Sequence, residues 1–243
     1  MARWTVFLDD GGVMNDNRLR GMQWQQFVAE FFAPRLGGTH EAWAEANREV
    51  MNRILEPVGW EARLQASPDY RSFDRTYLID WLQGMCVLVG VSAPADDECF
   101  ALAHQASAAI PPRVRSAFPG VVEAIRALHQ RGYALSTASG ESSTDLAGYL
   151  TGMGVRGCFQ HLYGPDLINT HKHGPAYYER IFADAGVDPA RALIVDDNPG
   201  PIVWARQAGA RAVLIGDARS VGLEEVPCLP SLAHLPEVIE RLE

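Results

Sequence analysis

The sequence contains few cysteines, and none of them lies close to another. The four residues are Cys86, Cys99, Cys158 and Cys228. Zinc ribbons and thioredoxin-like redox sites need a Cys-x-x-Cys pair, so this spacing excludes both. Isolated cysteines in a chain of 243 residues are typical of small core side chains in a protein from a reducing compartment.

The sequence also lacks a run of lysines and arginines. It has 21 basic residues against 30 acidic ones, which gives a formal net charge of −9. A protein that binds DNA or RNA through the phosphate backbone needs a basic stripe, so we do not expect a nucleic-acid partner. A small anionic substrate is still compatible with this charge, because a local site can be positive on an acidic protein.

No hydrophobic run is long enough to cross a membrane. The longest one, near residues 86–91, is far shorter than a membrane span, and the overall composition is typical of a globular protein. The apolar stretch that follows Met1-Ala2-Arg3 ends at Asp9, which makes it too short for a signal peptide, and no cleavage site follows it. We therefore expect a cytoplasmic protein with no membrane partner.

Strands and helices alternate in the second half of the chain. A first strand stands apart from them, since residues 4–8 form a continuous apolar run rich in strand-forming residues. The later predicted strands are residues 133–138, 159–163, 192–195 and 212–215. Helical patterns separate these strands and end the chain, and this alternation predicts an α/β fold with a Rossmann-like parallel sheet that is covered on both faces.

Residues from about 20 to 110 differ, because no convincing strand interrupts them. Apolar residues recur there at helical spacing in four segments. The expected helices are residues 21–32, 39–55, 67–89 and 94–110. Since the first strand belongs with the later ones, we expect this all-α block to be an inserted cap domain. The predicted boundaries are residues 1–16 and 112–243 for the α/β core domain, and residues 17–111 for the cap.

Acidic side chains follow two of the predicted strands. Ligands of an open parallel sheet bind beyond the carboxyl ends of its strands, so the residues after each strand are the candidates for a site. Asp9 and Asp10 follow the first strand, and Asp196 and Asp197 follow residues 192–195. Carboxylates grouped at one edge repel one another unless a cation lies among them, and oxygen ligands favour Mg²⁺. A carboxylate can also act as a nucleophile and form an aspartyl-phosphate.

A hydroxyl and a lysine are expected at the same edge of the sheet. Ser139 and Gly140 follow the strand at residues 133–138, and Lys172 lies in a loop just before a helix. His171 and His173 flank this lysine. A His-x-His pair can bind zinc, but the sequence shows no third or fourth ligand at a suitable spacing.

These motifs resemble, in their order and spacing, those of the haloacid dehalogenase superfamily of phosphotransferases and hydrolases, in the subgroup with an α-helical cap of the C1 type. The family's first motif is an apolar strand followed by Asp-x-Asp-Gly-Thr/Val and a later acid, and residues 6–16 are similar to it. Residues 118–121 (Phe-Pro-Gly-Val) resemble the start of the helix before the second motif, and residues 132–140 resemble the second motif itself. Residues 172–178 resemble the third motif, with His173 where proline is usual, and residues 195–199 resemble the fourth.

The resemblance implies a nucleophile and a metal site. Asp9 would attack the phosphorus atom in line. Asp9, Asp197 and the backbone carbonyl of Gly11 would hold Mg²⁺, and Asp196 would bind the ion directly or support a residue that does. In the alternative register, Asp10-Gly11 would be the family's second Asp and Gly. That register places Leu8 at the position of the nucleophile, so we prefer Asp9.

The resemblance also implies a phosphate site. Ser139, with nearby backbone N–H groups such as that of Gly140, would hold a phosphoryl oxygen. Lys172 would neutralise charge on the nucleophile and on the group being transferred, an electrostatic role that counts most in a dry site.

Two positions depart from the family's pattern. Gly11 replaces the second Asp, which acts as the general acid/base, and such help is typically worth about 10²–10⁴-fold in rate. Asp10 is adjacent, but successive residues that leave a strand point to opposite sides, so it is not an obvious substitute. Asp16 is a second candidate proton carrier. The other departure is Pro201, where the family often has a further Asp or Asn near the metal.

The sequence thus predicts a Mg²⁺-dependent hydrolase of phosphate monoesters that acts on a small phosphorylated metabolite through an aspartyl-phosphate on Asp9. Gly11 leaves open a degenerate member that binds a phosphorylated ligand or a protein partner with little or no turnover. Loss of the second Asp also fits a metal-independent 2-haloacid dehalogenase, although the pair Asp196-Asp197 argues against a site without a cation. The sequence specifies neither the substrate nor the oligomeric state.

Overall fold

The computed structural model of this protein describes residues 4–216 and 223–242, so Met1 to Arg3 of the N-terminal segment lie outside the described residues. The chain divides into two compact units. The first unit, the core, comprises Met1–Asn17 and Arg115–Glu243, and the second comprises Arg18–Val114. The sequence predicted residues 17–111 for the inserted segment, so the predicted start differs from that of the second unit by one residue and the predicted end by three.

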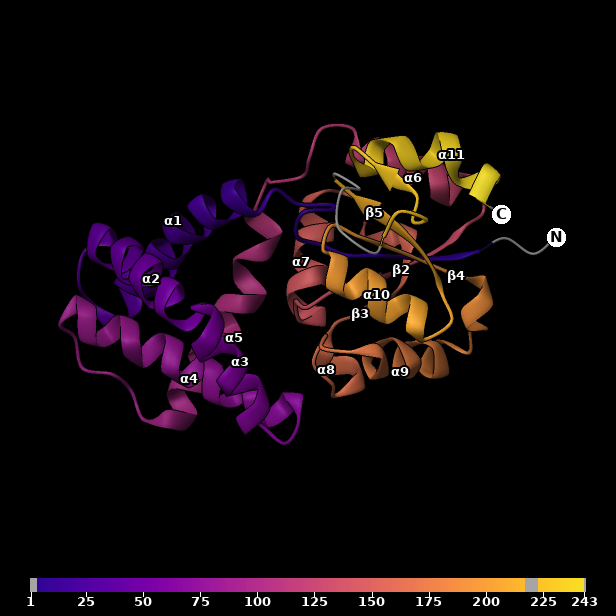
Figure 1. The fold of residues 1–243 in the computed structure, drawn as a ribbon. Helices are drawn as coiled ribbons and strands as arrows, with labels where there is room; N and C mark the ends of the chain where they lie inside the picture. The colour runs from indigo at the N-terminus through magenta and orange to yellow at the C-terminus, as the bar shows by residue number, and fades with distance from the viewer. Residues whose placement is uncertain (1–3, 217–222, 243) are drawn as a thin grey trace. The chain divides into compact units, whose positions relative to one another are not determined.

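The core is built on a six-stranded parallel sheet in the order β3-β2-β1-β4-β5-β6. Figure 1 labels β2, β3, β4 and β5 of this sheet. The strands are β1 (Thr5–Leu8), β2 (Ala134–Ala138), β3 (Phe159–Tyr163), β4 (Ala192–Asp196), β5 (Arg211–Ile215) and β6 (Cys228–Leu229). The central strand β1 pairs with β2 and β4, and Leu8 at its end lies opposite both Thr137 and Val195. Three strands therefore end at the same level, which brings the residues that follow them to one edge of the sheet.

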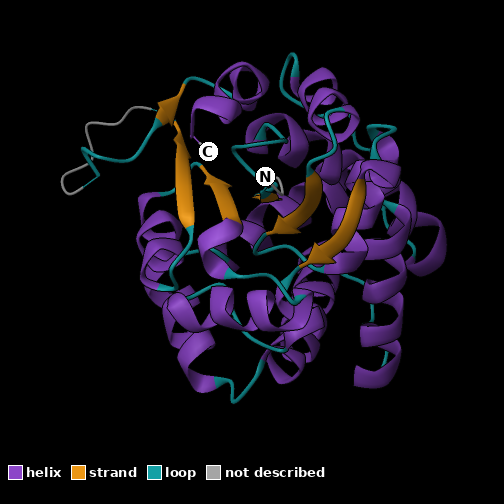
Figure 2. Ribbon diagram, turned by 90° about the vertical axis from the view of Figure 1, so that its right-hand side faces the viewer, coloured by secondary structure: helices purple, strands orange, loops and turns teal. Residues whose placement is uncertain are grey.

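Helices cover both faces of this sheet (Figure 2). One face packs against α6 (Val121–Gln130), α7 (Ser143–Gly152) and α11 (Leu235–Leu242), and the other against α9 (Pro175–Ala185) and α10 (Pro199–Gln207). The side chains of β1 alternate between these two cores: Val6 and Leu8 enter the first, and Phe7 enters the second. This period of two confirms the predicted doubly covered α/β sheet.

Local signals in the sequence start the helices that flank the strand ends. Ser142 precedes α7, and its hydroxyl accepts a hydrogen bond from the Asp145 N–H at 3.1 Å. Asn198 precedes α10 and accepts from the Gly200 N–H at 3.0 Å, with Pro199 at the first helical position. Such caps satisfy N–H groups that a helix leaves unpaired, so each chain segment turns into its helix directly after the strand edge. A further short helix, α8 (Pro165–Ile168), follows β3.

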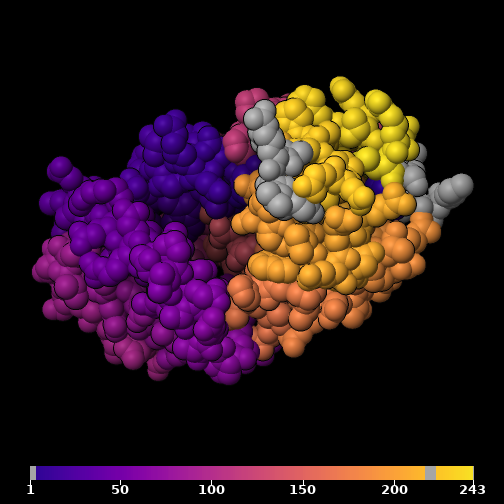
Figure 3. Space-filling view, viewed as in Figure 1, coloured from indigo at the N-terminus to yellow at the C-terminus, as the bar shows by residue number. Residues whose placement is uncertain are grey.

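The second unit consists of helices. They are α1 (Asn17–Leu36), α2 (His40–Ile54), α3 (Pro57–Ala66), α4 (Tyr70–Val89) and α5 (Asp96–Ala109). Aromatic side chains form its interior: the rings of Phe32 and Trp43 stack at 5.2 Å, and Trp81 donates a buried hydrogen bond to Asn47 at 2.9 Å. In the space-filling view these helices form the indigo-to-magenta surface (Figure 3).

The helix α3 was not expected from the sequence. It contains no buried residue, so it lacks the apolar face by which helical spacing is recognised. Two further expectations can be compared directly with the described residues. No helix among them is long and apolar enough to cross a membrane. The four cysteines are free thiols; Cys86 and Cys99 are buried, and the other two are half-buried.

Candidate active site

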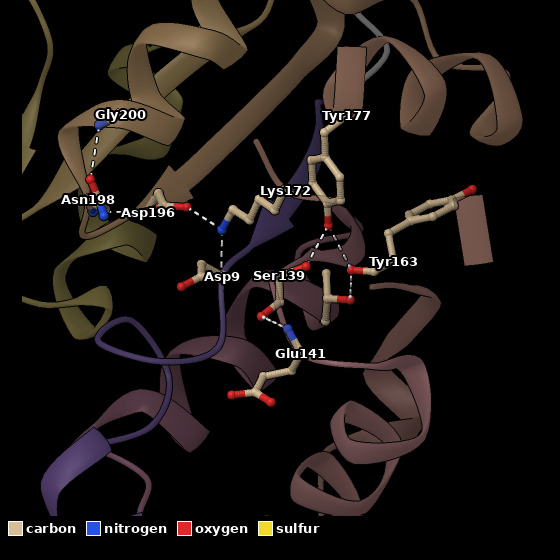
Figure 4. Close-up of polar contacts among 10 residues, drawn as sticks. Asp9, Ser139, Glu141, Tyr163, Lys172, Tyr177, Asp196, Asn198 and Gly200 are labelled. Atoms are coloured by element: carbon tan, nitrogen blue, oxygen red, sulfur yellow. Dashed lines mark hydrogen bonds and ion pairs between the residues drawn. The ribbon is translucent and has the colours of Figure 1, made fainter. Parts of the chain in front are cut away.

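Polar side chains from three strand ends and one loop meet at the carboxyl edge of the sheet (Figure 4). Asp9 follows β1, Ser139 follows β2, and Asp196 is the last residue of β4. Lys172 enters from the loop before α9. The shared register of β1, β2 and β4 brings these residues together, as the strand-end argument from the sequence predicted.

Lys172 bridges two of the acidic residues. Its Nζ atom donates to Asp9 Oδ1 at 2.8 Å and to Asp196 Oδ2 at 2.7 Å. The side chains of Lys172 and Asp9 are each 10% exposed, and that of Asp196 is 1% exposed. Burial works to lower the pKa of Lys172, but the charges of Asp9 and Asp196 outweigh it and hold that pKa well above its usual value. The lysine is therefore a permanent ammonium in this site.

Three carboxylates share the space around this ammonium. One oxygen from each of Asp9, Asp196 and Asp197 lies within 4.8 Å of the others. Burial raises the pKa of Asp196, the charge of Asp9 adds to the rise, and Lys172 opposes it. Asp197 is exposed as a residue, but partial desolvation of its carboxylate, followed by the charge of Asp9, also raises its pKa. In their ionised forms, three carboxylates with one ammonium leave two uncompensated negative charges, and a small divalent cation would compensate them and favour those forms.

Asp196 and Asp197 have different surroundings. Asp196 Oδ1 accepts from the Asn198 N–H at 2.9 Å and Oδ2 accepts from Lys172, so both of its oxygens already have a donor. Asp197 is exposed and lies against Gly12. Gly12 has φ +82°, and a Cβ atom at this position would lie 2.0 Å from Asp197 Oδ2. Only glycine therefore allows the turn to approach this carboxylate.

Ser139 is held in place by contacts that the sequence did not indicate. Its N–H donates to the Tyr163 carbonyl at 3.1 Å, and its Oγ accepts from the Glu141 N–H at 3.3 Å. The buried hydroxyl of Tyr177 donates to the Ser139 carbonyl at 2.7 Å. In the sequence, the only sign that Tyr177 supports Ser139 was a pair of tyrosines shortly after Lys172. Such a pair by itself indicates a buried helix face. Gly140 is exposed at the same loop.

Tyr178, the second member of this pair, has a buried hydroxyl with no hydrogen-bond partner among the described residues. Burial raises its pKa, and the nearby charge of Lys172 opposes the rise. Buried hydroxyls are normally paired, so this group marks unused hydrogen-bonding capacity close to the lysine.

Other sequence candidates do not join the carboxylate group. Asp10 is fully buried, and its Oδ1 accepts from Asn15 Nδ2 at 2.7 Å. In the part of the chain that the structure describes, the metal-compatible cluster holds three aspartates, without Asp16 and without a histidine. The His173 ring packs 5.4 Å from that of Trp204, and neither His173 nor His171 belongs to that cluster. Pro201 is buried within α10.

Comparisons with known proteins agree with this geometry. Residues 101–215 match a family model described as haloacid dehalogenase-like hydrolase. Haloacetate dehalogenase H-2 of Moraxella sp. (strain B) is 34% identical over 92 residues, which is 38% of this chain and 41% of that protein. Phosphoglycolate phosphatase of Rhodospirillum rubrum is 29% identical over 118 residues, 49% of this chain and 48% of that protein. The chain thus matches less than half the length of these curated relatives.

Solved structures share the fold over almost the whole chain. L-2-haloacid dehalogenase from Xanthobacter autotrophicus is 17% identical, with a TM-score of 0.62 and full coverage of both chains. A HAD phosphatase from Thermococcus onnurineus is 18% identical, with a TM-score of 0.59 and 97% coverage of each chain. Residues 101–215 therefore resemble a haloacid dehalogenase-like hydrolase, and the chain as a whole shares the fold of these solved structures.

Proposed function

We propose that this protein is a Mg²⁺-dependent hydrolase of phosphate monoesters, with Asp9 as its nucleophile and a small cytoplasmic metabolite as its substrate. The charge balance of the site carries the proposal. Asp9, Asp196 and Asp197 group their oxygens around a single ammonium, and the remaining negative charge suits a divalent cation. Phosphoglycolate phosphatases among the relatives support the same reaction class.

Asp9, Asp197 and the carbonyl oxygen of Gly11 are the groups that would hold the ion. Asp196 contributes mainly by holding Lys172, because both of its oxygens already accept hydrogen bonds. When bound, Mg²⁺ would polarise the phosphoryl oxygens and reduce the repulsion between the anionic substrate and the carboxylate nucleophile.

The two oxygens of Asp9 have different tasks. Oδ1 accepts from Lys172 and would bind the ion through its second lone pair, whereas Oδ2 has no hydrogen-bond partner among the described residues. Oδ2 attacks phosphorus, an Oδ2–P bond forms, and the ester P–O bond breaks. Gly11 has no side chain, so water supplies the proton to the leaving oxygen. The hydroxide that remains cleaves the acyl phosphate, which restores the carboxylate and releases inorganic phosphate.

Lys172 and the loop after β2 stabilise charge during this reaction. The ammonium stays fixed by Asp9 and Asp196, so it neutralises charge without having to reorient. The Ser139 hydroxyl and the N–H groups of its loop bind a phosphoryl oxygen. Tyr177 holds the carbonyl of Ser139 and therefore limits movement of the loop.

A panel of phosphorylated metabolites, assayed with Mg²⁺ and with EDTA, tests the proposal. We expect phosphate release that depends on Mg²⁺ and is abolished by Asp9→Asn, with unfolding temperature and circular dichroism close to the wild type. The substitution removes the nucleophile but keeps the size of the side chain and an acceptor for Lys172. Undiminished turnover in Asp9→Asn contradicts the assignment of the nucleophile.

Metal-independent hydrolysis of a carbon–halogen bond is the second candidate. Gly11 favours it, because that position has no side chain to protonate an ester oxygen, and a halide leaving group needs no proton. Lys172 already compensates part of the charge on Asp9. Halide release from 2-haloacids that persists in EDTA would support this reaction, and release of neither phosphate nor halide would support a degenerate ligand-binding member.

A further inference from the structure

A buried hydrogen-bond network surrounds the turn that follows Asp9. Asn15 donates from Nδ2 to Asp10 Oδ1 at 2.7 Å and accepts at Oδ1 from Ser116 Oγ, also at 2.7 Å. Asp10 is 0% exposed, and Asn15 and Ser116 are each 1% exposed. Each of these bonds is costly to break at such depth, because a buried polar group would be left unsatisfied.

The main chain of the turn is tied by the same residues. The Asp10 carbonyl accepts from the N–H groups of Met14 and Asn15, each at 2.8 Å. The Asn15 carbonyl accepts from the Gly12 N–H at 2.8 Å. Asn15 therefore holds the turn at three places, through its N–H, its carbonyl and its side chain.

This turn touches the candidate site directly. Gly12 lies against the Asp197 carboxylate, and the carbonyl of Gly11, just before it, is the one that the proposed function assigns to the cation. Asp9 is the residue immediately before the turn. A change in the backbone path of residues 10–15 would therefore move three things together: the Gly11 carbonyl, the contact between Gly12 and Asp197, and the backbone of Asp9.

We propose that Asp10 is a positioning residue that acts through Asn15 and Ser116 to fix the turn that presents Gly11 and Gly12 to the cation site. The part of this inference that concerns the cation rests on the proposed function. Its basis is the chain of buried side-chain bonds from Asp10 to Ser116, which connects the residue beside the nucleophile to a segment about 100 positions later in the sequence.

The chemistry of Asn15 explains why a carboxylate is needed at position 10. The Asn15 amide has a donor side and an acceptor side, and Ser116 donates to its acceptor side. Asp10 Oδ1 accepts from the donor side of this amide, so the two contacts together determine the orientation of the amide. This use of its carboxylate, together with its complete burial, separates Asp10 from the role of proton donor.

An exchange of the two side chains tests the inference. Asn15→Asp places two buried carboxylates against each other and should displace the turn. Adding Asp10→Asn restores the pairing in reverse, because the amide at position 10 donates to the carboxylate at position 15, which Ser116 also reaches. We expect Asn15→Asp to weaken Mg²⁺ binding, measured by calorimetry, by about 10–100-fold. We expect the double variant to recover most of this loss.

The matched control is Tyr163→Phe. It removes a hydrogen bond of 2.7 Å between Tyr163 and Asp184, which lies outside the turn. We expect this variant to lower the unfolding temperature without a change in the dissociation constant for Mg²⁺. If Mg²⁺ binding in the Asn15→Asp and Tyr163→Phe variants simply follows their unfolding temperatures, the positioning role is wrong.

Failure of the proposed function gives a different result. In that case the wild type itself binds no Mg²⁺, and the part of the inference that concerns the cation falls with it. The pairing of Asp10 with Asn15 is then tested by the unfolding temperatures of the variants alone. It is supported if the double variant regains the unfolding temperature lost in Asn15→Asp, and it is overturned if the two losses add.

Discussion

At the scale of single residues, two adjacent glycines have opposite consequences for the site. Gly11 stands where the family has an acidic side chain, and it retains only its backbone carbonyl. Gly12 adopts φ +82° against the carboxylate of Asp197, a place where a side chain does not fit. The first glycine leaves its position without a side chain that could donate a proton, whereas the second allows the turn and the Asp197 carboxylate to come close together.

Gly11→Asp should change the dependence of rate on the leaving group. Gly11 does not share the left-handed backbone of Gly12, so a side chain meets no penalty from φ there. A carboxylic acid at this position would protonate the departing oxygen, a contribution of about 10²–10⁴-fold. We expect faster hydrolysis of alkyl phosphates and little change for aryl phosphates with acidic phenols, measured as kcat/KM across a series. Equal effects on both classes would contradict a missing proton donor.

Gly12→Ala should damage both the fold and cation binding. The new Cβ would lie 2.0 Å from Asp197 Oδ2, and alanine is strained at this φ by about 1–3 kcal/mol. We expect a lower free energy of unfolding and weaker binding of Mg²⁺, by denaturant titration and calorimetry. Gly157→Ala is the control, since a Cβ there meets nothing within 4 Å and its φ is ordinary. Similar losses in both variants would argue against the close contact.

At the scale of elements, the site depends on strands that end together and on a helix that supports one of their loops. The strands β1 to β5 were predicted to within one residue: β1, β4 and β5 are apolar runs, and β2 and β3 were located by their place between helical patterns. The two-residue strand β6 and the short helix α8 have no comparable signal. The support that α9 gives to the end of β2 was also missed, because it is a single contact between residues 38 positions apart.

Tyr177→Phe tests this support. The substitution keeps the ring in the core and removes the hydroxyl that donates to the Ser139 carbonyl at 2.7 Å. We expect a loss of about 1–2 kcal/mol in stability, as for other buried hydrogen bonds, together with a several-fold rise in KM for a phosphate ester. Tyr163→Phe should lower stability without the rise in KM. A KM that stays at the wild-type value in Tyr177→Phe would show that the loop needs no such support.

At the scale of the whole molecule, the two hydrophobic clusters that pack on the sheet are built from residues of the core alone. These clusters lie on the two faces of the sheet, and every member belongs to residues 4–14 or 118–242. The two points at which the chain leaves and re-enters the core are adjacent, because the Asp16 N–H donates to the Ser116 carbonyl at 2.8 Å. The helical unit is therefore an insertion between neighbouring positions of the core.

Replacing residues 18–114 by a short Gly-Ser linker should leave the core folded. The linker has only a short distance to span, and closing a short loop costs little entropy. We expect cooperative thermal unfolding and a dispersed NMR spectrum from the shortened protein. A molten or aggregated product would show that the core needs the helical unit for its stability.

The sequence by itself determined the α/β class, the helical insertion and the residues at the strand ends, because periodicity and motif order are local properties of the chain. It also predicted that these residues meet, since parallel strands end at one edge of a sheet. Only the tertiary structure decided how they meet. Lys172 bridges Asp9 and Asp196, and Asp197 lies against Gly12. Asp10 joins a buried hydrogen-bond network with Asn15 and Ser116. These contacts join residues far apart in the chain, and they depend on packing and burial that no local pattern encodes.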